Sequence, residues 1–81
     1  MKNSFDRLLN TEGLICPEPV MMLHSAVREV QAGDVIKVIA TDPSTERDIP
    51  KFCQFLGHEL LEVTRDGEQW VYFIQTASAS E

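Results

Sequence analysis

The chain has 81 residues, of which 43% are hydrophobic and 25% charged, as expected for one small globular domain near the lower size limit for a single core. Thirteen acidic residues against seven basic ones give a formal charge of −6, and no Lys/Arg cluster is available for a phosphate backbone, so tight direct nucleic-acid binding is not expected. No apolar run approaches the roughly 20 residues that span a bilayer, and residues 1–7 lack the apolar core of a signal peptide, so we expect a cytoplasmic protein that does not enter membranes.

The first elements expected are a strand and a helix. Residues 5–10 carry apolar side chains among polar neighbours and predict a short strand. A helix is predicted from about Pro17 to about Gln31, with Gly33 as its left-handed cap. At about 100° per residue, one side of this helix collects its apolar residues, namely Val20, Leu23, Ala26, Val27 and Val30.

A second strand and a second helix follow. Residues 35–40 are mostly β-branched and apolar, which predicts a central strand, and the strand–helix–strand order implies a right-handed parallel crossover. Residues 42–45 supply turn and capping residues for a helix that reaches about Leu56. Pro50 must lie in its first turn or bend it. The apolar stripe of this helix is predicted to contain Ile49, Phe52, Cys53 and Leu56.

The last part of the chain reads as a hairpin. Gly57 is expected to stop the second helix, and strands at 59–65 and 69–75 are expected to be joined by a turn at Asp66-Gly67. Residues 75–81 are expected to form a frayed tail. The order predicts an α+β fold in one domain covering residues 1–81: a two-layer βαβαββ sandwich with two helices on one face of a mixed four-stranded sheet.

Cys16 is the first candidate for chemistry, because it lies where a helix begins. The positive end of the helix dipole favours a thiolate at this position. Against this, Pro17 and Pro19 remove two N–H donors, and Glu18 adds a negative charge that opposes ionisation. We therefore expect an exposed, moderately activated thiol suited to exchange between sulfur atoms. The alternative is a buried cysteine that packs as a small hydrophobic residue.

The second cysteine, Cys53, lies in the apolar stripe of the second helix and is expected to be buried. The two cysteines are far apart in the sequence and show neither CxxC nor paired-histidine spacing, so neither a structural disulfide nor a zinc site is expected. His24 and His58 would complete a four-ligand site only by coincidence of folding.

Four helix-surface residues are candidates for partner docking. Met21 lies about one turn beyond Cys16 on the polar side of the first helix, where it would be a soft contact for a partner or simply an exposed apolar residue. Arg28, Arg47 and Asp48 are expected on solvated helix faces, and docking is a possible additional role for them.

The stretch Leu14-Ile15-Cys16-Pro17-Glu18-Pro19-Val20-Met21-Met22 resembles the TusA, or SirA-like, sulfur-carrier family, whose signature is a cysteine followed by Pro-x-Pro at the start of the first helix. The resemblance continues through residues 40–43 (ATDP), 47–50 (RDIP) with Phe52-Cys53, and 57–60 (GHEL), and it spans about residues 9–74.

This resemblance implies the same two-layer fold and a sulfurtransferase in the broad sense. It implies that Cys16, supported by the motif residues Pro17, Glu18 and Pro19, accepts sulfur as a persulfide from a cysteine desulfurase. The sulfur then passes to a downstream relay protein, and the relay ends in 2-thiolation of the wobble uridine of certain tRNAs. No cofactor is expected in this chain, because the pyridoxal phosphate belongs to the desulfurase.

Other functions stay open on the sequence. A regulatory interaction module would use the surface around Glu18 and Met21. Sulfur supply to molybdenum cofactor or to other sulfur metabolism would use the same thiol. A thiol redox enzyme would need a resolving cysteine within disulfide distance of Cys16.

Overall fold

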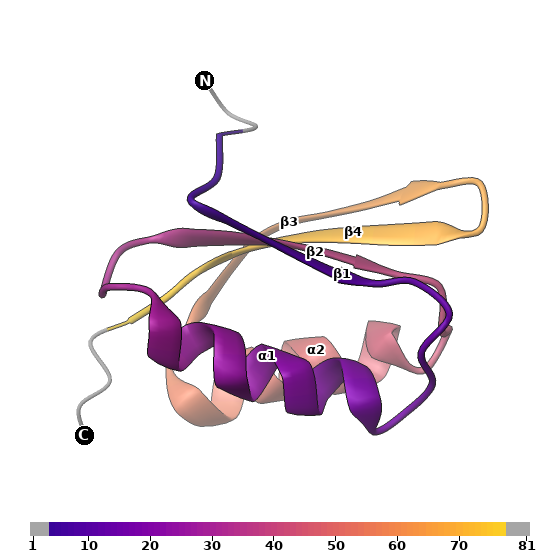
Figure 1. The fold of residues 1–81 in the computed structure, drawn as a ribbon, viewed down its shortest axis with the longest axis horizontal. Coiled ribbons are helices and arrows are strands. Elements are labelled where there is room, and N and C mark those ends of the chain that lie inside the picture. Colours follow the sequence, from indigo (N-terminus) through magenta and orange to yellow (C-terminus); the bar gives the residue numbers. More distant parts are fainter. Residues whose placement is uncertain (1–3, 78–81) are drawn as a thin grey trace.

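The computed structural model describes residues 4–77, which form a mixed four-stranded sheet with both helices on one face (Figure 1). The elements are β1 (Arg7–Thr11), α1 (Glu18–Glu29), β2 (Val35–Ala40), α2 (Thr45–Leu56), β3 (Glu59–Asp66) and β4 (Gln69–Gln75). The strand order is β1-β2-β4-β3; β1 and β2 are parallel, and β4 is antiparallel to both of its neighbours. The predicted α+β, two-layer βαβαββ sandwich is confirmed. No helix within residues 4–77 is long and apolar enough to cross a membrane.

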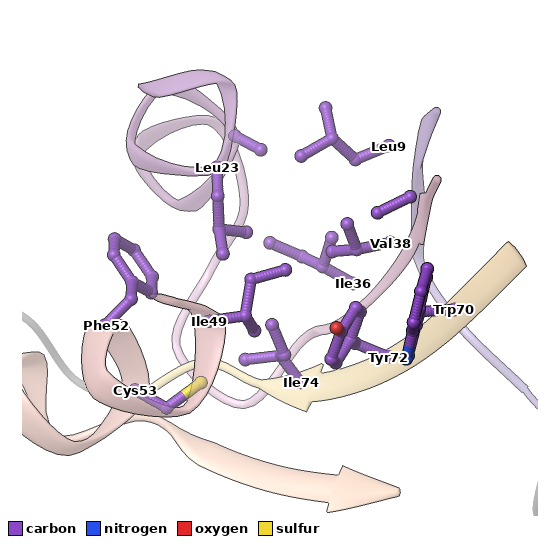
Figure 2. Packing of buried hydrophobic residues seen from close by; sticks show 12 residues of the cluster. Leu9, Leu23, Ile36, Val38, Ile49, Phe52, Cys53, Trp70, Tyr72 and Ile74 are labelled. Carbon is purple, nitrogen blue, oxygen red and sulfur yellow. The ribbon is translucent and has the colours of Figure 1, made fainter. Parts of the chain in front are cut away.

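The core lies between the helices and one face of the sheet (Figure 2). Because side chains alternate along a strand, β2 directs Ile36, Val38 and Ala40 to this face, and all three are fully buried. The predicted apolar sides of both helices meet them. From α1, Leu23 and Ala26 are buried, while Val20, Val27 and the residue after the helix, Val30, pack at the edge. From α2, Ile49, Phe52 and Cys53 are buried.

The helix α1 ends earlier than predicted, at Glu29, because Val30 adopts an extended conformation (φ −115°, ψ 170°). Gly33 does have a positive φ of 93°, but it serves the turn before β2 and does not cap the helix. In that turn the Asp34 N–H donates to the Gln31 carbonyl at 2.9 Å, and the Asp34 carboxylate accepts the Gln31 N–H at 3.0 Å. Closure of this turn ends the helix two residues before the predicted boundary.

The first strand lies one to two residues later than predicted. Asp6, the second residue of the predicted strand, lies before β1. Its carboxylate accepts the Val35 N–H at 2.8 Å, and its own N–H donates to the Val35 carbonyl. At the other end, Thr11 is buried and donates its hydroxyl to the Ile39 carbonyl at 2.7 Å, which holds one more residue in the strand.

The helix α2 ends at Leu56 as predicted, with Gly57 as a left-handed cap at φ 79°. Pro50 lies in the interior of the helix and not in its first turn, so the Glu46 carbonyl has no N–H donor four residues on. Leu56, which the sequence places in the apolar stripe of this helix, is not part of the core, because 45% of it is exposed.

The hairpin turn lies one residue later than predicted. Asp66 pairs with Gln69, so the loop residues are Gly67 and Glu68. Gly67 has a φ of 63°, and Glu68 does not have a positive φ, which is the arrangement of a type II′ hairpin. Further back in β3, the register shifts between Leu60 and Glu62, leaving a β-bulge in this edge strand.

The expected tail begins later than residue 75. Gln75 belongs to β4, and Thr76 is 4% exposed, with its N–H donating to the Asp34 carbonyl and its carbonyl accepting the Gly33 N–H. The Ala77 N–H donates to Nδ1 of His58 at 3.0 Å. Residues 78–81 of the predicted tail lie outside the described residues.

Candidate functional site

Cys16 lies on the segment between β1 and α1, and its side chain is exposed and free. The alternative of a buried Cys16 is therefore wrong. Pro17 is the N-cap of α1, and the Cys16–Pro17 peptide bond is cis. The two prolines carry no N–H, and the Glu18 N–H donates to the Ile15 carbonyl at 2.9 Å. As the sequence predicts, this helix start offers the sulfur few N–H donors.

Two aspartates from the second half of the fold hold Cys16 in place. Asp42, in the loop between β2 and α2, accepts the Cys16 N–H at 2.6 Å on Oδ2 and the Ser44 N–H at 3.0 Å on Oδ1. Asp48, in the first turn of α2, accepts a hydrogen bond from Cys16 Sγ at 3.1 Å on Oδ2. Arg47 Nε donates to Oδ1 of the same carboxylate at 3.1 Å. One aspartate thus fixes the backbone of Cys16 and the other its thiol.

The electrostatic environment disfavours a thiolate in the free protein. The hydrogen bond to Asp48 raises the pKa of Cys16 above its ordinary value, and partial desolvation and the charges of Asp48 and Asp42 raise it further, against a smaller opposing effect of Ser44. The sequence assigned the opposing negative charge to Glu18, but the carboxylates that act on the sulfur are Asp48 and Asp42. The same hydrogen bond lowers the pKa of Asp48.

A groove of about 620 Å³ lies between the two helices and includes Cys16. Its lining is mostly apolar, with single charged or polar groups at Asp48, Lys51 and His24. The residues are Cys16, Pro17, Val20, His24, Asp48, Lys51, Phe52, Phe55 and Leu56. Phe55 is 88% exposed, an unusual exposure for a phenylalanine on a helix. The thiol therefore adjoins an open apolar surface.

The four predicted docking residues are not brought together. Asp48 bonds the sulfur directly, which corrects the expectation of a merely solvated position, and Arg47 pairs with it while remaining 65% exposed. Met21 is 59% exposed and lines a separate hollow that also contains Glu18. Arg28 is exposed in the last turn of α1, at the opposite end of that helix from Cys16.

Sequence reasoning missed the contributions of Asp42 and Phe55. Asp42 lies in a segment with turn residues, and only the family resemblance of residues 40–43 pointed to it. Phe55 is a large aromatic residue outside the apolar stripe of α2, and that mismatch with the helical period was a usable signal. Cys53 is 3% exposed, and burial raises its pKa to about 11, as expected for a structural cysteine.

Phe52, which lines the groove, contacts the rings of His24 and His58. Phe52 meets His24 edge-on, with ring centroids 4.7 Å apart, and stacks on His58 at 5.6 Å. His58 is buried, and its Nδ1 accepts the Ala77 N–H, so this nitrogen carries no proton. Desolvation lowers the pKa of His58, and the charge of His24 lowers it further.

We expect the free energy of unfolding to fall as the pH drops below about 6.5, the ordinary pKa of histidine. Because the folded-state pKa of His58 is lowered, the unfolded chain takes up a proton at a higher pH than the folded chain does. The contribution of neutral His58 to stability is therefore fully present above the unfolded-state pKa, and it is lost as the pH falls through the folded-state pKa. The loss should be about 1 kcal/mol, the size of the hydrogen bond to Ala77.

Urea unfolding at a series of pH values measures this effect. His58→Asn keeps an acceptor but does not titrate, so its stability should stay flat over this range. His24→Asn should retain most of the pH dependence. An unchanged pH dependence in the His58 variant would show that another group is responsible.

Within residues 4–77 no group of three or more His, Cys, Asp or Glu side chains is arranged to hold a metal ion. Fold and site together define a small two-layer α+β domain that presents one hydrogen-bonded thiol beside an apolar groove. The family model of sulfurtransferase TusA matches residues 7–76, and the chain belongs to this family. The resemblance seen in the sequence is thereby confirmed.

Two relatives agree with this assignment, and one solved structure shares the fold. The chain is 57% identical over 75 residues to a sulfur carrier protein TusA of Pseudomonas aeruginosa, covering 93% of this chain and 95% of the relative. It is 61% identical over 70 residues to a sulfur carrier protein TusA of Pseudomonas putida, covering 86% and 88%. The crystal structure of a SirA-like protein from Desulfitobacterium hafniense has the same fold, with a TM-score of 0.78 at 21% identity over 90% of this chain and 100% of that one.

Proposed function

We propose that the protein is a sulfur carrier that holds a sulfane sulfur as a persulfide on Cys16. The observation that carries the proposal is the exposed thiol in Cys-Pro-Glu-Pro at the start of α1, in a chain of the TusA family. The relatives named above are sulfur carrier proteins, which supports a sulfur-carrier function for this chain. The motif residues Pro17, Glu18 and Pro19 shape the segment that presents the sulfur.

The donor in this proposal is a cysteine desulfurase, whose pyridoxal phosphate liberates sulfur from cysteine and leaves it as a persulfide on the enzyme. The Cys16 thiolate attacks the outer sulfur, the S–S bond of the donor breaks, and the donor cysteine leaves as a thiolate. The proton lost by Cys16 balances that thiolate. The sulfane sulfur keeps its oxidation level, so the transfer needs no external oxidant or reductant.

The groove beside Cys16 supports docking of the segment that carries the partner's reactive cysteine. A partner sulfur must reach Sγ, and the apolar side chains of Phe55 and Leu56 offer contact area next to it. The formal charge of −6 favours partners with a basic docking surface. In this proposal both the desulfurase and the downstream relay protein use this surface in turn, in the cytoplasm.

Mass spectrometry after incubation with a cysteine desulfurase and cysteine tests the carrier function. The protein should gain the mass of one sulfur atom, and a reductant such as dithiothreitol should remove it. A chain that gains no sulfur from a desulfurase shown to be active would contradict the proposal.

The downstream route we propose ends at 2-thiouridine in the wobble position of certain tRNAs. Deletion of the gene should remove most of this nucleoside from hydrolysed tRNA, as measured by liquid chromatography and mass spectrometry, and the wild-type gene should restore it. Unchanged 2-thiouridine together with lost molybdoenzyme activity would instead place the sulfur in molybdenum cofactor.

A second candidate is a regulatory interaction module, favoured by the hollow around Met21 and Glu18 on the exposed side of α1. Such a module does not need the sulfur atom of Cys16. A Cys16→Ser strain that keeps the wild-type phenotype would therefore support it.

A further inference from the structure

We propose that Asp48 is a gate on Cys16: its carboxylate holds the thiol in its protonated, hydrogen-bonded form, and a partner opens the gate by placing a cationic group against that carboxylate. The inference rests on the proposed role of Cys16 as the sulfur acceptor. The group that binds the Asp48 carboxylate belongs to a partner protein and carries a positive charge next to the partner's own reactive sulfur.

The hydrogen bonds of Asp48 show how the Cys16 thiol is held in its protonated form. Asp48 uses Oδ2 for Cys16 Sγ at 3.1 Å and Oδ1 for Arg47 Nε at 3.1 Å, and its side chain is only 20% exposed. An ionised carboxylate can accept a hydrogen bond but cannot donate one. If Cys16 ionised in place, two negative charges would face each other at 3.1 Å with no hydrogen between them. The thiol form is therefore the stable partner of Asp48.

Asp48 is not placed to act as a general base for Cys16. It lies in the first turn of α2, where the helix dipole favours its charged form, and the hydrogen bond from Cys16 lowers its pKa while raising that of the thiol. A proton would thus move from a weak acid to a weak base. Because the thiolate is the nucleophile, the contact restrains the free carrier and does not activate it.

The surrounding charges favour a cation as the opening signal. Asp42 adds a second carboxylate at the Cys16 backbone, and its charge also raises the pKa of Cys16. Of the basic groups nearby, Arg47 engages the other oxygen of Asp48, and Lys51 and His24 line the groove. A partner cation that pairs with Oδ2 of Asp48 would take the acceptor from the thiol and offset the negative charge beside it.

Once Asp48 no longer bonds the thiol, a sulfane sulfur passes from the partner to Cys16 in a step whose atoms and charges balance. Cys16 loses its proton and its Sγ forms a bond to the outer sulfur of the partner's persulfide, while the partner's S–S bond breaks. The partner's cysteine leaves as a thiolate, which takes up the proton released by Cys16. Sulfur is exchanged without net oxidation or reduction, and Asp48 remains ionised throughout.

The pH profile of alkylation by iodoacetamide tests the closed state. In Asp48→Asn the profile of Cys16 should move to lower pH than in the wild type. A lower thiol pKa raises the thiolate fraction more steeply than it reduces the nucleophilicity of the thiolate. The alkylation rate at neutral pH should therefore rise about threefold for each pH unit by which the profile moves. Mass spectrometry of peptides separates Cys16 from Cys53, which is buried.

Glu46→Gln is the matched control, because Glu46 is exposed in the same turn of α2 and its replacement removes the same charge. Its alkylation profile should follow the wild type. The proposed role of Asp48 would be overturned if the pH profile of Cys16 alkylation in Asp48→Asn equalled that of the wild type or that of Glu46→Gln. Circular dichroism should show that both variants are folded.

Two small disulfides test the opening. Cystamine carries ammonium groups beside its sulfur atoms, and bis(2-hydroxyethyl) disulfide is its neutral counterpart. Relative to 2-mercaptoethanol as a reference thiol, the wild type should prefer cystamine several-fold, and the preference should weaken in Asp48→Asn and at high salt. An equal preference in wild type and variant would overturn the role of the cation.

Neither measurement uses a desulfurase, so the gate and the carrier function can fail separately. If the protein shows both reactivity effects but gains no sulfur from a desulfurase, the role of Asp48 stands and the proposed carrier function is wrong. If the protein gains sulfur but lacks the reactivity effects, the carrier function stands and the proposed role of Asp48 is wrong.

Discussion

Replacing Cys16 by serine is expected to abolish sulfur loading, because a hydroxyl oxygen cannot accept a sulfane sulfur as a persulfide. After incubation with a cysteine desulfurase and cysteine, mass spectrometry should show the full gain of one sulfur atom in the wild type and none in Cys16→Ser. The fold should be unaffected, since the side chain is exposed and the oxygen can still donate a hydrogen bond to Asp48.

Cys53→Ala is the control for this experiment. Cys53 is 3% exposed in the core between α2 and the sheet, so its thiol is not accessible to a partner (Figure 2). The variant should therefore load one sulfur atom, as the wild type does. Loading that survives Cys16→Ser but is lost in Cys53→Ala would reverse the assignment of the acceptor.

Leu23→Ala is expected to lower the free energy of unfolding by about 2–5 kcal/mol, the range for truncation of a fully buried leucine. Leu23 has no exposed surface and projects from α1 into the core (Figure 2). A domain of this size has a total stability of only about 5–15 kcal/mol, so the loss is a large fraction of it. Urea unfolding should show a lower midpoint with an unchanged dependence on urea concentration.

Phe55→Ala provides the comparison on the other helix. Phe55 is 88% exposed, and alanine is the better helix former, so the stability should change by no more than about 0.5 kcal/mol. If Phe55→Ala were as destabilising as Leu23→Ala, the assignment of core and surface would be wrong. A slower loading by the desulfurase at unchanged stability would support the groove as the docking surface.

The fold was largely predictable because its elements carry strong local patterns. The β-branched run of β2 and the apolar stripe of α2 are periodic enough to give their bounds within a residue, and Gly57 marks the helix end. The errors lie where side chains compete with the backbone. The Asp34 carboxylate closes the turn that ends α1 early, and the Asp6 carboxylate replaces strand pairing at the start of β1.

The site was predictable only in part. The position of Cys16 beside two prolines at a helix start is local information, and so is the scarcity of N–H donors around its sulfur. Its two hydrogen-bond partners are 26 and 32 residues away, and their contacts depend on how the loop after β2 and the first turn of α2 lie against the start of α1. No periodicity describes that placement, so the sequence suggested Glu18 as the nearby carboxylate where the fold supplies Asp42 and Asp48.

The bulge in β3 has a consequence for the open edge of the sheet. β3 is an edge strand, and an unbroken edge invites a strand of another molecule to add to the sheet. The register shift at Leu61 interrupts the regular row of backbone donors and acceptors, and charged residues follow on both sides of it, namely Glu59, Glu62, Arg65 and Asp66. The backbone hydrogen-bonding pattern and the charged side chains of β3 thus discourage edge-to-edge aggregation.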